Sequence, residues 1–536
     1  MSSAPENPII ETSEIQGNIL AGFKKDYSKL LFAAVADDSI LAFRNWLRAM
    51  AQELSYTDAV LHFNRAFSAA RRSLAEEPTM SATWTNLAIT SNGIKRICSA
   101  SDLTAFEPTF LSGPSADAGL VGEPPVGSPG GPDTWLIGGA QFLPDVLLII
   151  AGDESQDVQA TCDRYAQQLQ ALAVAPTSIT IRVEDGHTRS AQPGHEHFGF
   201  KDCVSQPGIR GVSESAQGTL ITKRWLDPSD PLATPSTPLL SPAYSAPGQP
   251  LCWPGEFVLG YPRKKEGSIN PMETQDDPVT NLTKNGSYLV YRRLRQDVAT
   301  FRAETTRIAG FLSANASFGA RDADFAGACL VGRWASGAPL IRTQQQDLPN
   351  LGADSLASNN FLYTSKGAPP KYAPNSGAMP DVFPPAASDT PGKVCPFIAH
   401  VRKVNPRAQT TDQGPAVRTM EHRILRRGIP YGTDYDSTDA ASATEDRGLQ
   451  FLCYQSSIER GFQFLMNGWA NSEDFPLGGG VDPIIGQIAG APRPISISAP
   501  DGSEISTNLN LPFVRTTGAA YLFSPSRSSL EQHLGQ

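Results

Sequence analysis

The sequence predicts an α+β fold in which helices cover one face of a sheet. Apolar segments with strand character alternate with helical segments in the order strand–helix–strand, twice over in the first half of the chain, and a similar alternation recurs in the second half. A parallel doubly wound sheet is the alternative, but no GxGxxG motif lies between a strand and a helix. At 536 residues the chain exceeds one ordinary core, so we expect two or more domains, or one large domain with insertions.

The first half begins with an extended arm, residues 1–28, in which Gly17, Asn18 and Gly22 mark turns. The elements expected next are a strand at 29–36, a helix from Asp38 or Ser39 to about Leu54, a strand running into a helix at 83–97, a strand at 145–153, a helix to about Ala171 and a strand at 178–185. Residues 111–133 are rich in Gly, Pro and Ser, which predicts a loop.

The second half opens with a proline-rich connector, residues 226–256. A strand entering a helix is expected at 286–308, an irregular insertion at 343–395, a strand from about Leu449 leading into a helix through Met466, and a last strand at 513–525. The similar order of the two halves indicates a duplicated α+β unit, although no convincing sequence repeat supports it.

The composition and net charge of the chain indicate which classes of partner it is expected to lack. The net charge of −10 provides no electrostatic footprint for nucleic acid. The 7 cysteines are widely spaced without a CxxC pair, which fits reduced thiols. The N-terminus shows no secretory signal, and no apolar run approaches the ~20 residues that a membrane helix needs. We therefore expect no nucleic acid and no membrane partner, and a location that is cytoplasmic or extracellular by a route not visible in the sequence.

The stretch from Cys395 to Gly432 contains the first candidate site. His400 directly follows a short apolar run, and an imidazole at such a position is a candidate metal ligand. Arg402 and Arg407 form one basic cluster nearby, and Arg426 belongs to a second. Two such clusters suit a bound anion or charge that develops during a reaction. The alternative is a core histidine beside a solvated basic surface.

Asp202 lies in the turn HFGFKDCVSQPG, where partial desolvation makes a carboxyl group usable as a general acid or base; the alternative is an Asx-turn that caps the loop. His195 and His197 share one face of a strand, as in some metal sites, but no third ligand stands close by. Cys203 adjoins Asp202, and a cysteine in an apolar turn is usually inert. The sequence contains neither a GxSxG elbow nor a GxxxxGK[ST] loop.

A haem site unites more of these features than any other chemistry. His400 suits an axial ligand, Asp202 a group that relocates a proton between the two oxygens of a peroxide, and Arg426 a cation for the departing oxygen. The chain also carries the motifs EIQGNILAGF (14–23), HFGFKDCVSQPG (197–208), AHVRKVNPR (399–407), HRILRRGIPYG (422–432), RGLQFLCYQSSIERGFQFLMNGWAN (447–471) and GVDPIIGQ (480–487). In these motifs and their order it resembles the dye-decolorising peroxidase family, specifically its fungal-type branch.

The resemblance implies two ferredoxin-like halves with antiparallel sheets flanked by helices, at residues 1–225 and 226–536, with one haem b per chain held mainly in the second half. By motif position, His400 matches the proximal ligand, Asp202 the distal acid–base group and Arg426 the distal arginine. Asp482 resembles the carboxylate that accepts a hydrogen bond from the proximal imidazole.

Further positions follow from the same resemblance. Leu449 and Phe451 look like residues that line the distal side. Arg402 and Arg407 are expected to contact haem propionates or acidic side chains. Trp469 and Tyr431 are candidates for an electron relay to the surface, with simple packing as the alternative.

The function implied is a peroxidase that uses hydrogen peroxide to oxidise dyes, phenols and other aromatic reductants by one-electron steps. A haem-binding or haem-handling protein with little turnover is the alternative, and the sequence does not reveal the oligomeric state. One position departs from the family signature GxxDG, because Cys203 replaces the second glycine. If that glycine supplies a positive φ, Cys203 introduces strain.

Overall fold

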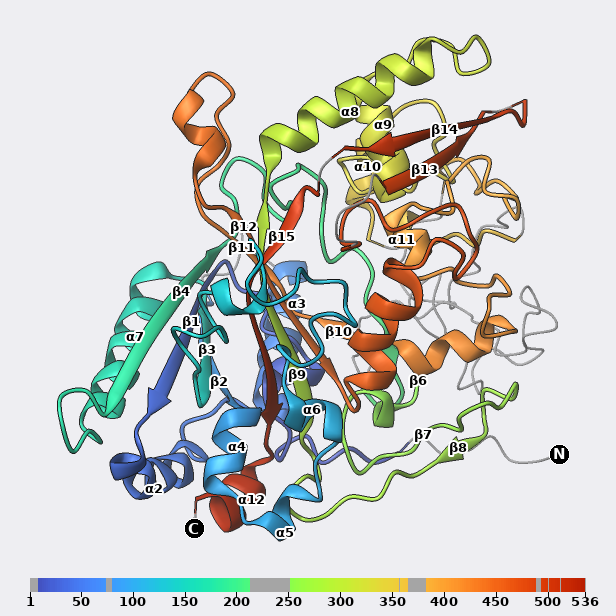
Figure 1. The fold of residues 1–536 in the computed structure, drawn as a ribbon. Helices are drawn as coiled ribbons and strands as arrows, with labels where there is room; N and C mark the ends of the chain where they lie inside the picture. The colour runs from blue at the N-terminus through green and yellow to red at the C-terminus, as the bar shows by residue number, and fades with distance from the viewer. Residues whose placement is uncertain are drawn as a thin grey trace, which may run out of the picture.

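A computed structural model describes residues 8–73, 80–212, 251–355, 357–364, 382–487, 493–499, 501–510 and 512–535. Most of the expected connector at 226–256 therefore lies outside the described residues, and so does the division expected near residue 225. The α+β fold class is confirmed: helices flank an antiparallel sheet (Figure 1).

Nine strands of the described residues form the main sheet, and every pairing between neighbours in it is antiparallel. Their order is β10 (Leu425–Arg426), β12 (Gly448–Gln455), β9 (Ser287–Gln296), β15 (Val514–Ser524), β2 (Thr83–Thr90), β3 (Val146–Gly152), β1 (Tyr27–Val35) and β4 (Ile179–His187), and β11 (Ile429–Tyr431) also pairs with β12. Each strand expected from the apolar runs is present within a few residues of its predicted position.

Strand β15 joins the strands of the two predicted halves. It runs beside β9 along its whole length, and it pairs with β2 through Leu522↔Thr90 and Phe523↔Ile89. The strands of both halves therefore share one sheet, because the last strand of the chain returns to the middle of the molecule.

The helices are α1 (Gly17–Leu20), α2 (Ile40–Met50), α3 (Thr57–Ser73), α4 (Ser91–Ile97), α5 (Ala100–Leu103), α6 (Pro108–Ser112), α7 (Ser155–Gln170), α8 (Val298–Ser313), α9 (Ala323–Val331), α10 (Pro349–Ala353), α11 (His400–Lys403) and α12 (Arg527–Ser529). Two π-helical segments, η7 (Glu459–Gln463) and η8 (Leu465–Ala470), follow β12 where the sequence predicted a helix. Among the described residues, none of these helices has the length and apolar character needed to cross a bilayer.

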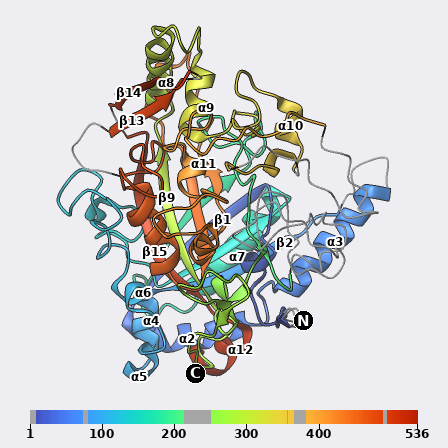
Figure 2. The ribbon, with the colours of Figure 1, turned by 90° about the vertical axis from the view of Figure 1, so that its right-hand side faces the viewer.

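Minor strands complete the described part of the chain. They are β5 (Gly208–Ile209), β6 (Leu251–Cys252), β7 (Arg263–Lys264), β8 (Thr274–Gln275) and the hairpin of β13 (Arg493–Ser498) and β14 (Glu504–Leu509). The hairpin lies beside α8 and α9 in both views of the ribbon (Figures 1 and 2). Helices α3 and α9 and this hairpin were not predicted from the sequence.

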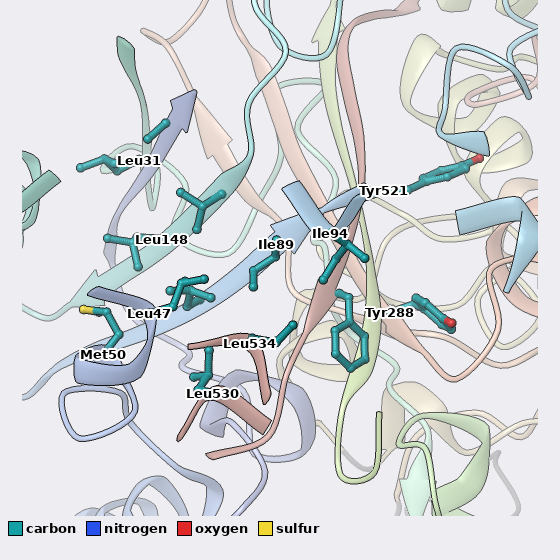
Figure 3. Packing of buried hydrophobic residues seen from close by; sticks show 14 of the residues in the cluster. Leu31, Leu47, Met50, Ile89, Ile94, Leu148, Tyr288, Tyr521, Leu530 and Leu534 are labelled. Atoms are coloured by element: carbon teal, nitrogen blue, oxygen red, sulfur yellow. The ribbon is translucent and has the colours of Figure 1, made fainter. Parts of the chain in front are cut away.

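Alternating side chains divide the core between the two faces of the sheet. On one face, Leu31, Ile89 and Leu148 come from β1, β2 and β3 and pack with Leu47 and Met50 of α2 (Figure 3). On the other face, their strand neighbours Leu30, Ala88 and Leu147 pack with the N-terminal arm. The arm was predicted to be extended with turns, but Gly17–Leu20 form the short helix α1, whose residues are all buried.

The two ends of the sheet approach each other. A side chain at Gly186 of β4 would come within 2.5 Å of Cγ2 of Ile429 on β11. Glu184 of β4 accepts hydrogen bonds from Arg293 Nε (2.7 Å) and Gln450 Nε2 (3.0 Å), which lie on β9 and β12. These contacts hold β4, at one end of the sheet, against β11, β9 and β12 near the other end.

Candidate active site

Residues from distant parts of the chain surround one cavity of about 280 Å³. Its lining is mostly apolar, and it includes His400 of α11, Arg426 of β10, and Asp202 from the loop that follows β4. The first predicted half thus contributes one wall and the second half contributes the others. An apolar cavity with a few convergent polar groups is the usual form of a cofactor site.

His400 is held by a buried carboxylate. Its Nδ1 lies 2.9 Å from Oδ2 of Asp482, which is fully buried. The backbone N–H groups of Ile484 and Ile485 donate to the other oxygen, at 2.9 and 3.0 Å. Burial alone would raise the pKa of Asp482, but the His400 charge and these hydrogen bonds outweigh it and lower that pKa. Asp482 therefore orients the imidazole with its Nε2 left for a ligand.

Lys403 connects the helix of His400 to the loop that precedes Asp482. Its buried ammonium group donates to the carbonyl oxygens of Ser472 (2.8 Å), Phe475 (2.8 Å) and Gly480 (2.5 Å). Burial lowers the pKa of Lys403 to about 8. Lys403 lies within the motif at 399–407, but the sequence does not indicate this role, because its partners are backbone carbonyls 69 to 77 residues away.

Asp202 and Arg426 form the second polar group at the cavity. Arg426 Nη1 donates to Oδ1 of Asp202 at 3.0 Å, and Nη2 donates to the carbonyl of Ser205 at 3.2 Å. Gln206 exchanges two hydrogen bonds of 3.2 Å with the backbone of Arg426. Residues 224 positions apart are thereby fixed in one arrangement.

Leu449 and Phe451 also line the cavity. They alternate along β12 with the buried Gln450 and Leu452, which face the other side of the sheet. The period of two along this strand places both apolar side chains beside Arg426, since β10 pairs with β12 through Arg426↔Cys453.

The two arginines of the first basic cluster take different places. Arg407 lines the cavity, with its guanidinium 3.7 Å from the centre of the Phe361 ring. Arg402 is fully buried, is not among the described residues that line the cavity, and pairs with Asp389 at 2.8 Å. Of the two partners expected for Arg402, a haem propionate or an acidic side chain, the structure shows the second, and the sequence did not identify Asp389 as that side chain.

Tyr431 and Trp469 are both buried, at 4% and 1% exposure, so neither presents its own ring to a dye at the surface. The Tyr431 hydroxyl lies between Arg293 (3.0 Å) and Asp446 (3.2 Å) and away from the cavity lining. Trp469 lies 6.1 Å from the ring of His422, which lines the cavity, and its indole N–H donates to the exposed Asp412 at 3.0 Å.

Cys203 has a φ of +53°, a left-handed conformation that favours glycine. The backbone N–H of Cys203 donates to Oδ1 of Asp202 at 2.6 Å. Asp202 is therefore in contact with both Cys203 and Arg426, although a cysteine stands where the family signature has glycine. Cys203 lines the cavity. Burial raises the pKa of Cys203 to about 11, which keeps the thiol protonated.

Comparisons with known proteins identify the family of this chain. Residues 14–189 match the model of the DyP dimeric alpha+beta barrel domain, and residues 366–475 match that of the C-terminal part of Dyp-type peroxidases. Peroxidase 2 of Mycetinis scorodonius is 30% identical over 99% of this chain and 89% of that protein. The chain belongs to the dye-decolorizing peroxidase family.

Solved structures of this family have the same fold. An ancestral D-type dye-decolorizing peroxidase superposes with a TM-score of 0.74 at 28% identity, covering 98% of this chain and all of that one. The enzyme of Auricularia auricula-judae gives a TM-score of 0.70 at 27% identity, covering 99% of this chain and 100% of that one. The protein is therefore a dye-decolorizing-type peroxidase, an oxidoreductase, and the alternative of a haem-handling protein is not favoured.

Three residues at the cavity of this peroxidase were missed in the sequence. Arg333 donates to the carbonyls of Gly337 and Ser358, both at 2.8 Å, and burial lowers its pKa to about 10. His422 stacks on Phe464 with 3.5 Å between ring centres. Glu196 lies inside the Asp202 loop. Of these three, only His422 lies within a motif, at the start of 422–432, and Glu196 directly precedes the motif at 197–208.

Proposed function

We propose that this peroxidase holds one haem b per chain and that His400 would bind its iron through Nε2. The donor set fits this group, since a neutral imidazole fixed by a carboxylate at Nδ1 is a typical haem ligand. The apolar cavity wall suits the porphyrin, and Arg407 and Arg333 suit its acidic side chains. The haem would supply the iron at which peroxide binds and the redox equivalents that oxidise the reductant.

The Asp202–Arg426 pair then acts on hydrogen peroxide. The Asp202 carboxylate would take the proton from one oxygen and return it to the other, which would leave as water, and the haem would supply the two electrons for cleavage of the O–O bond. The Arg426 guanidinium offsets the negative charge that develops on the departing oxygen. The 3.0 Å contact between the two side chains at one cavity with His400 is the observation that carries this proposal. A haem carrier has no need of such a pair.

The reducing substrates proposed are small phenols and bulky dyes. The solved structure of a related peroxidase in complex with 2,6-dimethoxyphenol supports the first class. A carboxylate base titrates below a histidine base, so we expect an acidic optimum for dye oxidation. A clear optimum above neutral pH would contradict Asp202 as the base.

A visible spectrum and a dye assay test the function together. The purified protein, reconstituted with haem where needed, should show a Soret band that changes on addition of peroxide and should decolorise dye. His400→Ala should lose the band, whereas Asp202→Asn should keep it and lose about 10²–10⁴-fold in kcat/KM for peroxide. An unchanged kcat/KM for peroxide in Asp202→Asn would refute the role of that residue, and an absent Soret band in the reconstituted wild type would refute the haem assignment.

A further inference from the structure

The loop that carries Asp202 is closed on itself. The N–H of Asp202 donates to the carbonyl of Gly194 at 2.9 Å, and the N–H of Glu196 donates to the carbonyl of Phe200 at 3.0 Å. The N–H of Gly199 returns to the carbonyl of Glu196 at 2.9 Å. Asp202 therefore lies at the base of a tight loop, and its direction depends on how the loop is held.

The side chain of Glu196 occupies the middle of this loop. Its Oε1 accepts the N–H of Phe200 at 2.9 Å, and its Oε2 accepts the N–H of Phe198 at 2.8 Å. Oε2 also accepts from Nε2 of Gln296 on β9. One carboxyl group thus satisfies two amides of the loop and connects them to the central sheet.

Apolar contacts fix the outer side of the same residues. The ring of Phe198 stacks on Phe301 of α8 with 4.3 Å between centres, and the ring of Phe200 meets the same side chain edge-on at 6.1 Å. The aromatic side chains face α8 while their amides face Glu196. The aromatic packing positions the loop against α8. The carboxyl group of Glu196 fixes the orientation of the loop's backbone amides.

We propose that Glu196 is a positioning residue for the peroxide step: its carboxyl group holds the 194–202 loop so that Asp202 faces Arg426 and the cavity. This inference rests on the proposed function, in which Asp202 moves the proton of the peroxide. Glu196 lines the cavity but acts through the loop, because its oxygens are occupied by the three donors.

The ionised form of Glu196 provides these acceptors in full. Burial raises the pKa of Glu196 to about 7, so both forms are present near neutral pH. Protonation turns one oxygen into an O–H donor that has no acceptor among these three N–H groups, so the variants are compared at about pH 8, where the carboxylate prevails. A glutamine at this position has one acceptor oxygen and one NH₂ donor, so it must lose a bond to Phe198 or Phe200 at any pH.

Glu196→Gln in the haem-loaded enzyme tests the inference. We expect kcat/KM for hydrogen peroxide to fall by about 10–100-fold, since small displacements of catalytic groups have effects of this size. The value of kcat/KM for a small phenol should stay unchanged, because reduction does not use Asp202. Hydrogen exchange at the amides of Phe198 and Phe200 should become faster. If the glutamine variant fails to fold, Glu196→Asp replaces it, because the shorter side chain withdraws both acceptor oxygens by one methylene. This variant should also lower kcat/KM for peroxide, leave kcat/KM for the phenol unchanged and speed exchange at the two amides.

Glu184→Gln is the matched control. It also neutralises a carboxylate that joins a strand to β9, through Arg293, but Glu184 is not among the described residues that line the cavity. Equal losses of both kcat/KM values in the Glu184 and Glu196 variants would overturn the inference, because the effect would then reflect general destabilisation.

Asp202→Asn separates this inference from the proposed function. If Asp202→Asn leaves kcat/KM for peroxide unchanged, the proposed function fails. If Asp202→Asn lowers that value and Glu196→Gln does not, only the positioning role of Glu196 is refuted. If both lower it, Glu196→Gln should have little further effect in the Asp202→Asn background, whereas additive losses would overturn the inference.

Discussion

Cys203 combines a side chain with a backbone conformation that suits glycine. Its φ of +53° costs an L-residue roughly 1–2 kcal/mol, part of which returns because glycine is more flexible when unfolded. We expect Cys203→Gly to raise the free energy of unfolding by up to about 1 kcal/mol in denaturant titrations. Cys203→Ala keeps the Cβ atom and should give no such gain; equal stability of the two variants would contradict the strain.

The same thiol is expected to resist peroxide. Because burial raises the pKa of Cys203 to about 11, the reactive thiolate is scarce at acidic and neutral pH. Inactivation by excess peroxide should therefore proceed at the same rate in the wild type and in Cys203→Ala. The sequence showed the departure from the motif and allowed for a positive φ at Cys203, but it did not show the surroundings of the thiol.

Trp469 is the better supported of the two relay candidates. It lies between His422 at the cavity and the exposed Asp412, whereas Tyr431 is held by Arg293 and Asp446 away from the cavity lining. We expect Trp469→Phe to lower kcat/KM for a large dye and to leave that for a small phenol unchanged. Tyr431→Phe serves as the control, and loss of dye oxidation in it alone would reverse the assignment.

The partly buried side chain of Glu184 joins β4 to the paired strands β9 and β12. Glu184 accepts from Arg293 and Gln450, so its replacement leaves a mostly buried guanidinium with Asp446 as its remaining acidic partner. Glu184→Gln should lower the free energy of unfolding by about 1–3 kcal/mol, a typical value for hydrogen bonds to charged groups. Denaturant titration checks this, and unchanged stability would mean that the contact between the sheet ends does not depend on the charge.

Elements were predictable from local pattern, and their partners were not. The apolar run at 145–153 and the alternation around Leu449 and Phe451 identified β3 and β12, because burial imposes these patterns on each strand. Helix α3 and the β13–β14 hairpin were missed. The pairing of β15 with β2 and of Arg402 with Asp389 was also missed, since contacts between distant residues leave no spacing signal in a single sequence.

The family motifs supplied the long-range information that periodicity lacks. They associated Asp202 with Arg426 and His400 with Asp482, and the structure brings each pair within hydrogen-bonding distance. They did not distinguish Arg407, which lines the cavity, from Arg402, which does not. Position in a motif indicates that a residue matters but not whether it faces the site or the core.

The whole molecule contains carboxyl groups that oppose folding at neutral pH. Burial raises the pKa of Glu256 to about 7 and that of Glu107 to about 6, in addition to Glu196. Each such group has an ordinary pKa in the unfolded chain and a raised pKa in the folded protein. At a pH between these two values, the folded protein binds more protons than the unfolded chain. The free energy of unfolding therefore falls as pH rises through that window. The buried His197, with a pKa lowered to about 4, contributes in the opposite direction below pH 6.5.

Glu256→Gln isolates one of these contributions. The side chain is 5% exposed, and its carboxyl accepts the backbone N–H of Lys264 at 2.9 Å, a bond that the glutamine oxygen can retain. Below the ordinary pKa of 4.5 both states of the wild type are protonated, so the variant and the wild type should differ little. As pH rises towards about 7, the wild type should lose stability relative to the variant, and above that value the difference should level off. Denaturant titrations from pH 4 to about pH 8 measure the difference. A difference that stays constant across this range would show that Glu256 is already ionised in the folded protein, with Lys264 and the nearby arginines compensating for its burial.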